Sequence, residues 1–338
     1  MSEIPNRHKE DVEDQCPYSA NNSKEQDRQL LEPFTYLLQV PGKNIRKKLL
    51  KAFNIWLNVK EEKVRAIGEI VQMLHNASLL LDDIEDSSIL RRGIPVAHKI
   101  YGEASTINSA NYVMFIALER VIALGHPSAV SVYTEQMLEL HRGQGMEIYW
   151  RDNFRCPTED EYKEMTIRKT GGMFNLAVKL MQLFANSSST DGHKSNQSID
   201  RFADITALIG LYFQVRDDYA NLKMDEYTAN KSFAEDLTEG KFNFPIIHAI
   251  TNFPADNRIM NILRQRTTDI EVKKYCISLL EDAGSFRYSL GVLEDLDLKI
   301  RAEIEKLGGN PVLVQLMDEL KNWKPPSEKN TLKDLVDT

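Results

Sequence analysis

The chain has 338 residues, of which 42% are hydrophobic, so it is long enough to bury one large core or two smaller ones. Its net charge of −8 argues against nucleic acid as the main partner. No run approaches the roughly 18 uninterrupted apolar residues of a transmembrane helix. We therefore expect a protein with no membrane span, no nucleic-acid partner and no C-terminal prenylation motif.

The cysteines and the N-terminal stretch indicate a cytoplasmic protein. Cys16, Cys156 and Cys276 are odd in number and widely spaced, which is typical of reduced thiols and not of a disulfide framework. Residues 1–29 are polar and acidic. They have neither the apolar core of a signal peptide nor the Arg-rich character of a mitochondrial presequence.

Helical periodicity dominates the chain from Leu30 onward. We predict helices over Leu30–Leu38, Val64–Asp86, Ser109–Leu124, Val130–Trp150, Asp160–Phe184, Leu208–Asn221 and, as a longer amphipathic region, Asn257–Leu320. Because no stretch shows sustained period-two alternation and no Pro/Gly-rich linker divides the chain, the sequence predicts an all-α protein. The predicted organisation is a flexible polar arm at 1–29, a single domain at 30–322 with a polar surface loop at 186–198, and a polar tail at 323–338.

A basic segment, PGKNIRKKL, follows the first predicted helix and leads into another. Lys43 and Arg46 in this segment are candidate contacts for an anion. The alternative is a solvated helix start, because most lysines and arginines lie on protein surfaces.

The predicted helix Val64–Asp86 ends in four acidic residues within five positions: Asp82, Asp83, Glu85 and Asp86. In an α-helix Asp82 and Asp86 lie one turn apart, about 6 Å along the axis, on one face. His75 and Ser78 share that face with Asp82. Taken alone, this cluster is better explained by a solvated helix end than by a metal site, because a chain with 50 acidic residues contains such triplets by chance.

A second helix repeats this layout. The apolar run Leu208–Asn221 ends in Asp217, Asp218 and Asn221. Gln214 lies on the face shared with Asn221. Two clusters with one spacing, each beside an apolar run, favour a shared site. Facing carboxylates repel one another unless a cation lies between them, and Mg²⁺ combines such oxygen ligands with substrate phosphates.

Basic residues flank both acidic clusters. Arg91 and Arg92 follow the first cluster, and guanidinium groups bind phosphate through paired hydrogen bonds. An irregular charged stretch follows the second cluster and holds Lys231, Asp236 and Lys241. The alternative to a role of this stretch in the site is an ordinary charged loop.

Lys169 and Thr170 precede a Gly171-Gly172 pair inside a helical pattern. Since glycine destabilises a helix relative to alanine, the pair indicates a bend or a close approach of two backbones. His141 lies in the preceding predicted helix. The alternative to a role in the site is a hydrogen-bonded histidine in the core.

Taken together, the motifs resemble a known family. DDIED followed by RR, FQVRDDYAN, PGKNIR, GQGME, KTGG and DLTEGK occur in the order typical of the trans-prenyltransferases, the isoprenyl diphosphate synthases. The chain resembles in particular their eukaryotic geranylgeranyl diphosphate synthase branch, over roughly Leu30 to Leu320. The resemblance implies an all-α helical bundle around a deep central cavity, in a homodimer or an assembly of dimers.

The resemblance also implies a reaction, the condensation of isopentenyl diphosphate with an allylic diphosphate. The expected acceptor is farnesyl diphosphate and the expected product is geranylgeranyl diphosphate. Magnesium ions and fixed cations would stabilise the charge on the leaving diphosphate, and a dry cavity would protect the allylic cation from water. The departed diphosphate would accept the proton, so no histidine base is required.

By this resemblance, aspartates of both clusters would hold about three Mg²⁺ ions on the allylic diphosphate. The implied metal ligands are Asp82, Asp86 and Asp217, and Asp83, Lys169 and Lys231 complete the catalytic set. The implied contacts to the allylic diphosphate are Arg91, Lys169, Thr170, Gln214, Lys231 and Lys241. Those to isopentenyl diphosphate are Lys43, Arg46, His75 and Arg92. Two residues stand where the family pattern usually has Asp, which leaves their roles open: Asn221 and Glu147.

Product length is predicted from small residues before the first acidic motif. Ser78 and Ala77 lie four and five positions before Asp82, where family members that stop at fifteen carbons carry bulky aromatics. We therefore predict a cavity that admits a longer tail. The candidates that close it more deeply are Tyr112, Phe115 and His141, for which the alternative is ordinary core packing.

Three other functions remain open. A farnesyl diphosphate synthase would differ only at the cavity wall. A class I terpene cyclase shares the first aspartate motif, but Lys43 and Arg46 would then have no role. A non-catalytic regulatory subunit or cation-binding scaffold is the third, and the intact acidic clusters argue against it.

Overall fold

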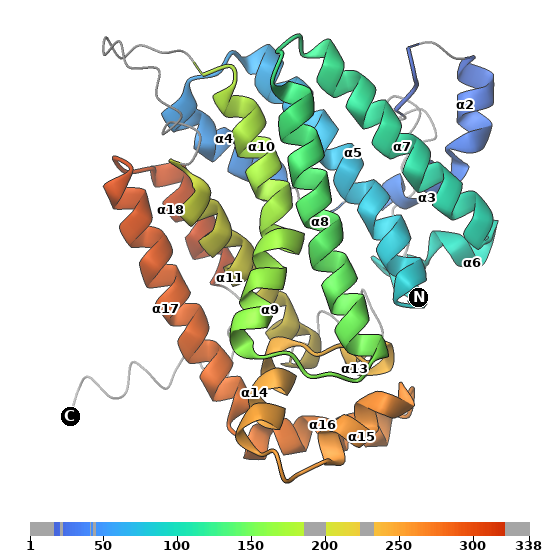
Figure 1. Ribbon diagram of the computed structural model, residues 1–338, viewed down its shortest axis with the longest axis vertical. Helices are drawn as coiled ribbons and strands as arrows, with labels where there is room; N and C mark the ends of the chain where they lie inside the picture. The colour runs from blue at the N-terminus through green and yellow to red at the C-terminus, as the bar shows by residue number, and fades with distance from the viewer. Residues whose placement is uncertain are drawn as a thin grey trace.

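Figure 1 shows a computed structural model of the chain, which describes residues 17–20, 23–40, 42, 45–185, 201–223 and 233–321. Almost all regular structure in these ranges is helical, which confirms the predicted all-α class. The first half contains α2 (Lys24–Leu30), α3 (Glu32–Leu38), α4 (Ile45–Leu57), α5 (Glu61–Glu85), α6 (Ala97–Tyr101), α7 (Glu103–Ala123) and α8 (Ala129–Asp152). The second half contains α9 (Glu159–Thr166), the π-helix η1 (Ile167–Gly171), α10 (Gly172–Gln182), α11 (Ala203–Lys223), α13 (Glu235–Glu239), α14 (Phe244–Asn252), α15 (Arg258–Gln265), α16 (Ile270–Asp282), α17 (Ser285–Lys306) and α18 (Pro311–Leu320).

The long helices run roughly along the long axis of the molecule, and the short helices α15 and α16 lie together at one end (Figure 1). Helix α5 packs on α7 and α10, α8 packs on α10, and α11 packs on η1 and α17. Their buried faces form one hydrophobic core. None of the described helices combines the length and the apolar character needed to span a lipid bilayer. The predicted loop 186–198 and the predicted tail 323–338 lie outside the described residues.

Helix α5 supports the first acidic cluster. Its buried apolar residues recur three or four positions apart: Val64, Ile67, Val71 and Leu74. Burying each such side chain is worth about 1.5–3 kcal/mol, so this face fixes the rotation of the helix. The helix begins at Glu61, earlier than predicted, with two acidic residues in a first turn that favours negative charge. It ends at Glu85, and Asp86 is its C-cap.

A short hairpin follows α5, made of β1 (Leu90–Arg91) and β2 (Ile94–Pro95). Its two loop residues both have positive φ, +55° at Arg92 and +81° at Gly93. Positive φ at both positions suits the right-handed twist of a tight hairpin. For Arg92 the left-handed conformation costs about 1–2 kcal/mol. The hairpin directs Arg91 toward α5 and Arg92 toward the segment at Val40, at the cost of that strain.

The predicted helix Asp160–Phe184 is divided into α9, η1 and α10, with the π-helix just before the second glycine of the pair. A Cβ on Gly210 would lie 2.5 Å from Cα of Gly171, and one on Gly143 would lie 2.6 Å from the backbone N of Lys169. Both the irregular turn and the close backbone approach predicted from the diglycine are therefore present. Short π-helical segments often occur at functional sites, and this one carries Lys169 and Thr170.

Part of the predicted N-terminal arm is helical. Helix α2 covers Lys24–Leu30, and its Asp27 is fully buried. Asp27 accepts hydrogen bonds from the backbone N–H of Ser19 at 2.9 Å and from the hydroxyl of Tyr112 at 2.6 Å. These bonds join the segment to α7.

Cys156 and Cys276 are free thiols, in agreement with the prediction of reduced cysteines. Burial raises the pKa of each thiol to about 12, so both stay protonated near neutral pH. Cys16 lies outside the described residues.

Candidate active site

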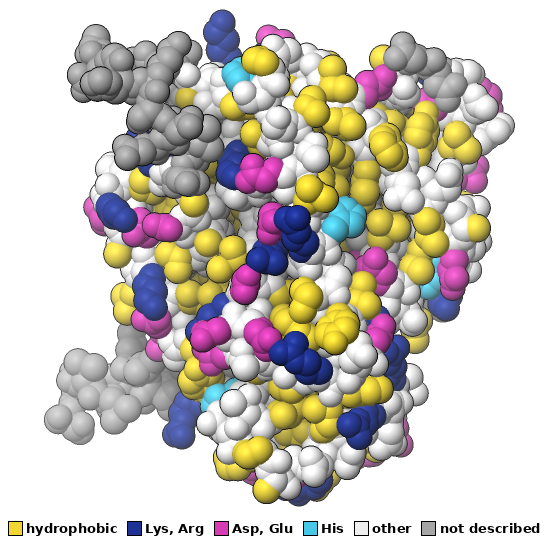
Figure 2. Space-filling view, in the orientation of Figure 1, with side chains coloured by type: hydrophobic (Ala, Val, Ile, Leu, Met, Phe, Trp, Pro, Cys, Tyr) yellow, Lys and Arg dark blue, Asp and Glu magenta, His cyan; other side chains and the backbone are white. Residues whose placement is uncertain are grey.

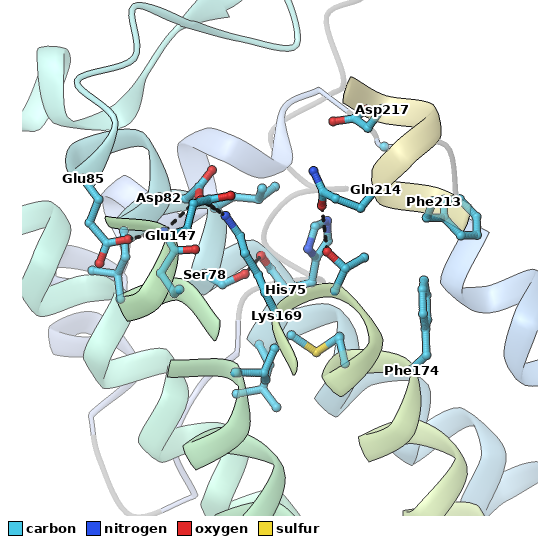
Figure 3. A pocket seen from close by; sticks show the side chains of 18 of the residues that line it. His75, Ser78, Asp82, Glu85, Glu147, Lys169, Phe174, Phe213, Gln214 and Asp217 are labelled. Atoms are coloured by element: carbon cyan, nitrogen blue, oxygen red, sulfur yellow. Dashed lines mark hydrogen bonds and ion pairs between the residues drawn. The ribbon is translucent and has the colours of Figure 1, made fainter. Parts of the chain in front are cut away.

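A cavity of about 580 Å³ lies between α5, α8, η1, α10 and α11. Its volume falls in the range of about 300–1,000 Å³ that is typical of small-molecule sites. Figure 3 shows Asp82 of α5 and Asp217 of α11 on opposite sides of it, with Lys169 and Gln214 between them. Apolar side chains, Phe174 among them, line another part of the cavity. The two acidic clusters therefore contribute to one cavity.

Asp82 receives hydrogen bonds from three separate elements. Its Oδ1 accepts from Nε2 of Gln144 at 3.2 Å and from Nζ of Lys169 at 3.4 Å. Its Oδ2 accepts from Nη2 of Arg91 at 3.3 Å. Gln144 also donates to Glu85 at 2.6 Å. Donors from α8, η1 and the hairpin thus converge on the carboxylates at the end of α5.

Asp83 and Asp86 point away from the cavity, because neither is among its lining residues. Asp83 is buried and accepts from Nε of Arg91 at 2.8 Å. Asp86 is buried, and its Oδ1 accepts from Nη1 of Arg151 at 2.7 Å while its Oδ2 accepts from Lys241. The backbone N–H of Asp86 donates to the carbonyl O of Asp82, so the two residues lie one turn apart as predicted. The side chain of Asp86 nevertheless pairs with two cations and does not line the cavity.

In the second cluster Asp217 and Asp218 line the cavity and Asn221 does not. The two aspartates differ in their surroundings. Asp218 is buried and accepts from the hydroxyl of Tyr162 at 2.6 Å, from Nε2 of Gln214 at 2.8 Å and from the backbone N–H of Phe244 at 2.8 Å. These three hydrogen bonds hold the Asp218 carboxylate in place, and the bond from Gln214 also fixes that side chain. Asp217 instead faces Asp82 across the cavity (Figure 3).

Three predicted diphosphate contacts meet between the two clusters. Nζ of Lys169 lies 2.5 Å from a carboxylate oxygen of Glu147. Burial lowers the pKa of Lys169, but Glu147 and Asp82 outweigh it and raise the pKa, so the ammonium stays charged. The hydroxyl of Thr170 donates to Oε1 of Gln214 at 2.8 Å. Lys231 lies outside the described residues.

A second group of basic residues lines the cavity beside α4. Arg46, His75 and Arg92 belong to it, and Nη1 of Arg92 donates to the carbonyl O of Val40 at 2.7 Å. Nε of Arg46 is buried with no hydrogen-bond partner among the described residues. Burial and then Arg92 lower the pKa of Arg46 to about 10. The excess of positive charge fits a second anionic ligand. Lys43 lies outside the described residues.

The residues predicted to set product length are only partly brought to the cavity. Ser78 lines it, and its hydroxyl donates to the carbonyl O of His75 at 2.8 Å. Ala77 is fully buried and is not part of the lining. His141 lines the cavity, with Nδ1 2.8 Å from the carbonyl O of Met137.

Tyr112 and Phe115 lie elsewhere. Tyr112 is held by Asp27 of α2 and is not among the lining residues. Phe115 is 69% exposed on the outer face of α7. The structure therefore does not place either side chain at the base of the cavity.

A sequence profile described as polyprenyl synthetase matches residues 27–280. The chain belongs to this family. A protein of Matsumurasca onukii named terpene synthase is 60% identical over 305 residues, covering 90% of this chain and 97% of that protein. A geranylgeranyl pyrophosphate synthase of Mucor circinelloides f. lusitanicus is 48% identical over 305 residues, covering 90% and 97%. Geranylgeranyl pyrophosphate synthase 1 of Zymoseptoria tritici is 50% identical over 289 residues, covering 86% and 84%. These matches confirm the family inferred from the motifs.

Sequence reasoning missed the methionines of this polyprenyl synthetase. Met114 of α7, Met137 of α8 and Met173 of α10 all line the cavity. Methionine is flexible and fills irregular apolar space, so three of them form an adaptable wall. Each methionine lies at a helical position that is typical of an ordinary core residue, so no local signal in the sequence distinguishes these three.

Asp236 belongs to the charged stretch after the second cluster, and no role was inferred for it from the sequence. It lies on α13, lines the cavity and is 7% exposed. Its backbone N–H donates to Oδ1 of Asn221 at 3.3 Å, and its Oδ2 accepts from Nδ2 of Asn243 at 2.9 Å. Asn221, whose role was open, thus orients Asp236. The DLTEGK motif contains the signal, but its irregular pattern gives no helix face from which to infer the direction of Asp236.

The donor set of the cavity fits a magnesium ion that is shared with a phosphate ligand. Asp82 and Asp217 offer carboxylate oxygens from opposite sides, and Asp236 adds a third. Among the described residues, no group of three or more His, Cys, Asp or Glu side chains is spaced to hold a metal by itself. Mg²⁺ commonly binds through one or two carboxylates and completes its shell with substrate phosphates and water.

Proposed function

We propose that this polyprenyl synthetase joins isopentenyl diphosphate to farnesyl diphosphate and releases geranylgeranyl diphosphate. The main support is the placement of Asp82 and Asp217 on opposite sides of one cavity that also has an apolar wall. Facing carboxylates suit a cation-bound diphosphate, and an apolar wall suits an isoprenoid tail. The names of two relatives at 48% and 50% identity support the same product.

We assign the allylic diphosphate to the charged part of the cavity. Its contacts are proposed to be Arg91, Lys169, Thr170, Gln214, Lys231 and Lys241. Ionisation of the allylic C–O bond leaves charge on the diphosphate, and cations fixed at that position lower the barrier without reorganising. Lys169 supports this assignment because it remains charged between two carboxylates that a phosphate can replace as its partners.

The carbon–carbon bond then forms in the apolar part. The double bond of isopentenyl diphosphate attacks the allylic cation, and a proton leaves to the departed diphosphate. Apolar residues such as Phe174 and Phe213 exclude the water that would otherwise capture the cation. Holding the two substrates in contact removes most of the entropic cost of their meeting.

Bound magnesium would supply additional positive charge at the leaving diphosphate. We propose Asp82 and Asp217 as its ligands, with about three ions per site as implied by the family resemblance. Asp86 was predicted as a further ligand. For Asp86 to act in that way, its ion pairs with Arg151 and Lys241 must rearrange.

We assign isopentenyl diphosphate to the basic group formed by Arg46, His75 and Arg92, with Lys43 beside it. Replacing Arg46 by leucine is expected to raise KM for isopentenyl diphosphate about 100-fold, because a paired hydrogen bond and a buried charge are lost. KM for the allylic substrate should change little. Steady-state kinetics with each substrate varied in turn measures both values. Lys48→Leu is the matched control, since Lys48 lies on the same helix but pairs with Glu319 at the surface.

A terpene synthase is the second candidate, because a relative that is 60% identical has that name. The two functions differ in one requirement: a cyclase needs no isopentenyl diphosphate. Release of diphosphate from farnesyl diphosphate is therefore measured with and without isopentenyl diphosphate. We expect release only when both are present. Rapid release with farnesyl diphosphate alone, together with an uncharged hydrocarbon product, would support the cyclase instead.

We further propose a homodimer through α7 and α8, or an assembly of such dimers. Figure 2 shows hydrophobic side chains gathered over these helices. The exposed ones are Ile107, Phe115, Ile122, Val130, Leu138, Met146 and Tyr149. Exposed apolar side chains gathered on one face are typical of protein–protein contact sites. The predicted cytoplasmic location stays a prediction.

Phe115→Asp is expected to convert the dimer to a monomer, since it buries a charge at the centre of this apolar face. Sedimentation velocity measures the change. Phe253→Asp is the control, because Phe253 is also exposed but lies on the connection after α14. A wild-type protein that is monomeric at micromolar concentration would refute the proposed interface.

A further inference from the structure

Lys273 of α16 is a buried cation that the proposed reaction does not use. It is 3% exposed, and its Nζ donates to the carbonyl O of Phe233 at 2.5 Å. Its sequence neighbour Lys274 is instead exposed and pairs with Glu271 of the same helix. Burying an ammonium group is costly unless it is paired and hydrogen-bonded. The position of Lys273 therefore calls for a structural or functional reason.

The residue after Phe233 has a strained backbone. Ala234 has φ +45° and ψ 58°, in the left-handed region, and is 1% exposed. An L-residue in this conformation persists only where its surroundings impose it. Lys273 binds the carbonyl group of the peptide that joins Phe233 to Ala234. The contact is thus placed to hold the strained turn.

This turn leads directly into α13, which carries Asp236. The helix has only five residues and is capped at its C-terminus by Gly240, which also has positive φ. A helix this short gains little from its own hydrogen bonds and depends on tertiary contacts. On one side, Asn221 and Asn243 hold Asp236. On the other side, Lys273 holds the residue that begins the turn.

Buried carboxylates of α13 act electrostatically on the same ammonium group. Glu235 and Glu239 of α13 are 2% and 3% exposed. Burial lowers the pKa of Lys273, while Glu235, Glu239 and Asp236 oppose that shift. Glu239 also pairs with Lys241 at 2.9 Å. Lys273 and Lys241 thus balance the charge of α13 from two directions.

We propose that Lys273 is a positioning residue: by holding the carbonyl of Phe233 it fixes the left-handed turn at Ala234, and this turn places the Asp236 carboxylate at the diphosphate end of the cavity. Lys273 itself does not line the cavity. The inference rests on the proposed function only in that Asp236 faces a metal-bound diphosphate. It adds a residue of α16 to the groups that determine binding at this site.

The test is binding of inorganic diphosphate in the presence of Mg²⁺, measured by calorimetry on the full chain. Lys273→Met is expected to weaken this binding at least tenfold, the effect usual for residues that orient a metal ligand. Lys274→Met is the matched control and should bind like the wild type. Unchanged binding by Lys273→Met would overturn the proposal. No Mg²⁺-dependent binding by the wild type would instead reject the proposed function.

A second variant separates positioning from general stability. In the Lys273→Met background, Ala234→Gly is expected to restore part of the affinity, since glycine adopts positive φ without strain. A merely structural role of Lys273 would leave the affinity of the double variant as low as that of the single one. If Lys273→Met does not fold, Ala234→Pro tests the same turn, because proline cannot adopt positive φ. It should weaken diphosphate binding at least tenfold, and wild-type affinity would overturn the proposal.

Discussion

Asp82→Asn is expected to lower kcat about 10³-fold, or about 4 kcal/mol in barrier height. Asparagine keeps the shape of the side chain but removes the negative charge that faces Asp217. In the structure this carboxylate accepts hydrogen bonds from Gln144, Lys169 and Arg91. Without it, the cation bound to the leaving diphosphate loses a ligand, and Lys169 loses a partner. Rates of product formation at saturating substrates and Mg²⁺ measure the effect.

The control for this variant is Asp160→Asn, because the side chain of Asp160 is 96% exposed at the start of α9 and forms an ion pair with Lys163 at 3.7 Å. It should retain wild-type activity. Both variants should unfold near the wild-type temperature, since neither removes a tightly packed group. An Asp82→Asn enzyme with more than a tenth of wild-type kcat would show that Asp82 does not hold the reacting diphosphate.

Ser78→Phe is expected to shift the main product from twenty to fifteen carbons. Ser78 lies on α5 one turn before Asp82 and lines the cavity, so a phenyl ring there occupies the path of the growing tail. Overfilling such a site also displaces neighbours, which typically costs about 1–3 kcal/mol. With geranyl diphosphate as starter, chromatography should detect farnesyl diphosphate as the end product. With farnesyl diphosphate as starter, turnover should fall at least tenfold.

Ser78→Ala is the matched control, because it removes the hydroxyl that bonds to His75 without adding volume. Its product should keep twenty carbons. If Ser78→Phe still made only the twenty-carbon product at a normal rate, the tail would run elsewhere in the cavity. The methionine-lined wall formed by Met114, Met137 and Met173 would then be the next candidate path.

The helices and their inward faces could be predicted because they depend on local periodicity. The run from Val64 to Asp86 alternates apolar residues at helical spacing, and α5 buries that face with its end within one residue of the prediction. The diglycine at 171–172 likewise predicts a bend or a close backbone approach, and the backbone of Gly210 lies close to Gly171. Patterns of this kind require no knowledge of the partner element.

The directions of side chains at the ends of elements could not be predicted, since they depend on distant residues. Asp86 turns to Arg151 of α8 and to Lys241 of the connection between α13 and α14, and Asp218 turns to Tyr162 of α9. Tyr112 shows the same limit, because its partner lies in a segment that the sequence assigned to a loose arm. The helical pattern gave the positions of these residues but not the cations and carboxylates that hold them.

The central claim is that Asp82 and Asp217 bind one diphosphate together from opposite sides of the cavity. A double-variant cycle of Mg²⁺-dependent diphosphate binding tests this most directly, with Asp82→Asn, Asp217→Asn and the pair compared by calorimetry. The account predicts that each single change weakens binding at least tenfold, and that the pair is little weaker than either one, because the bridged site is already lost. Losses that simply multiply, or an Asp217→Asn variant that binds like the wild type, would contradict it.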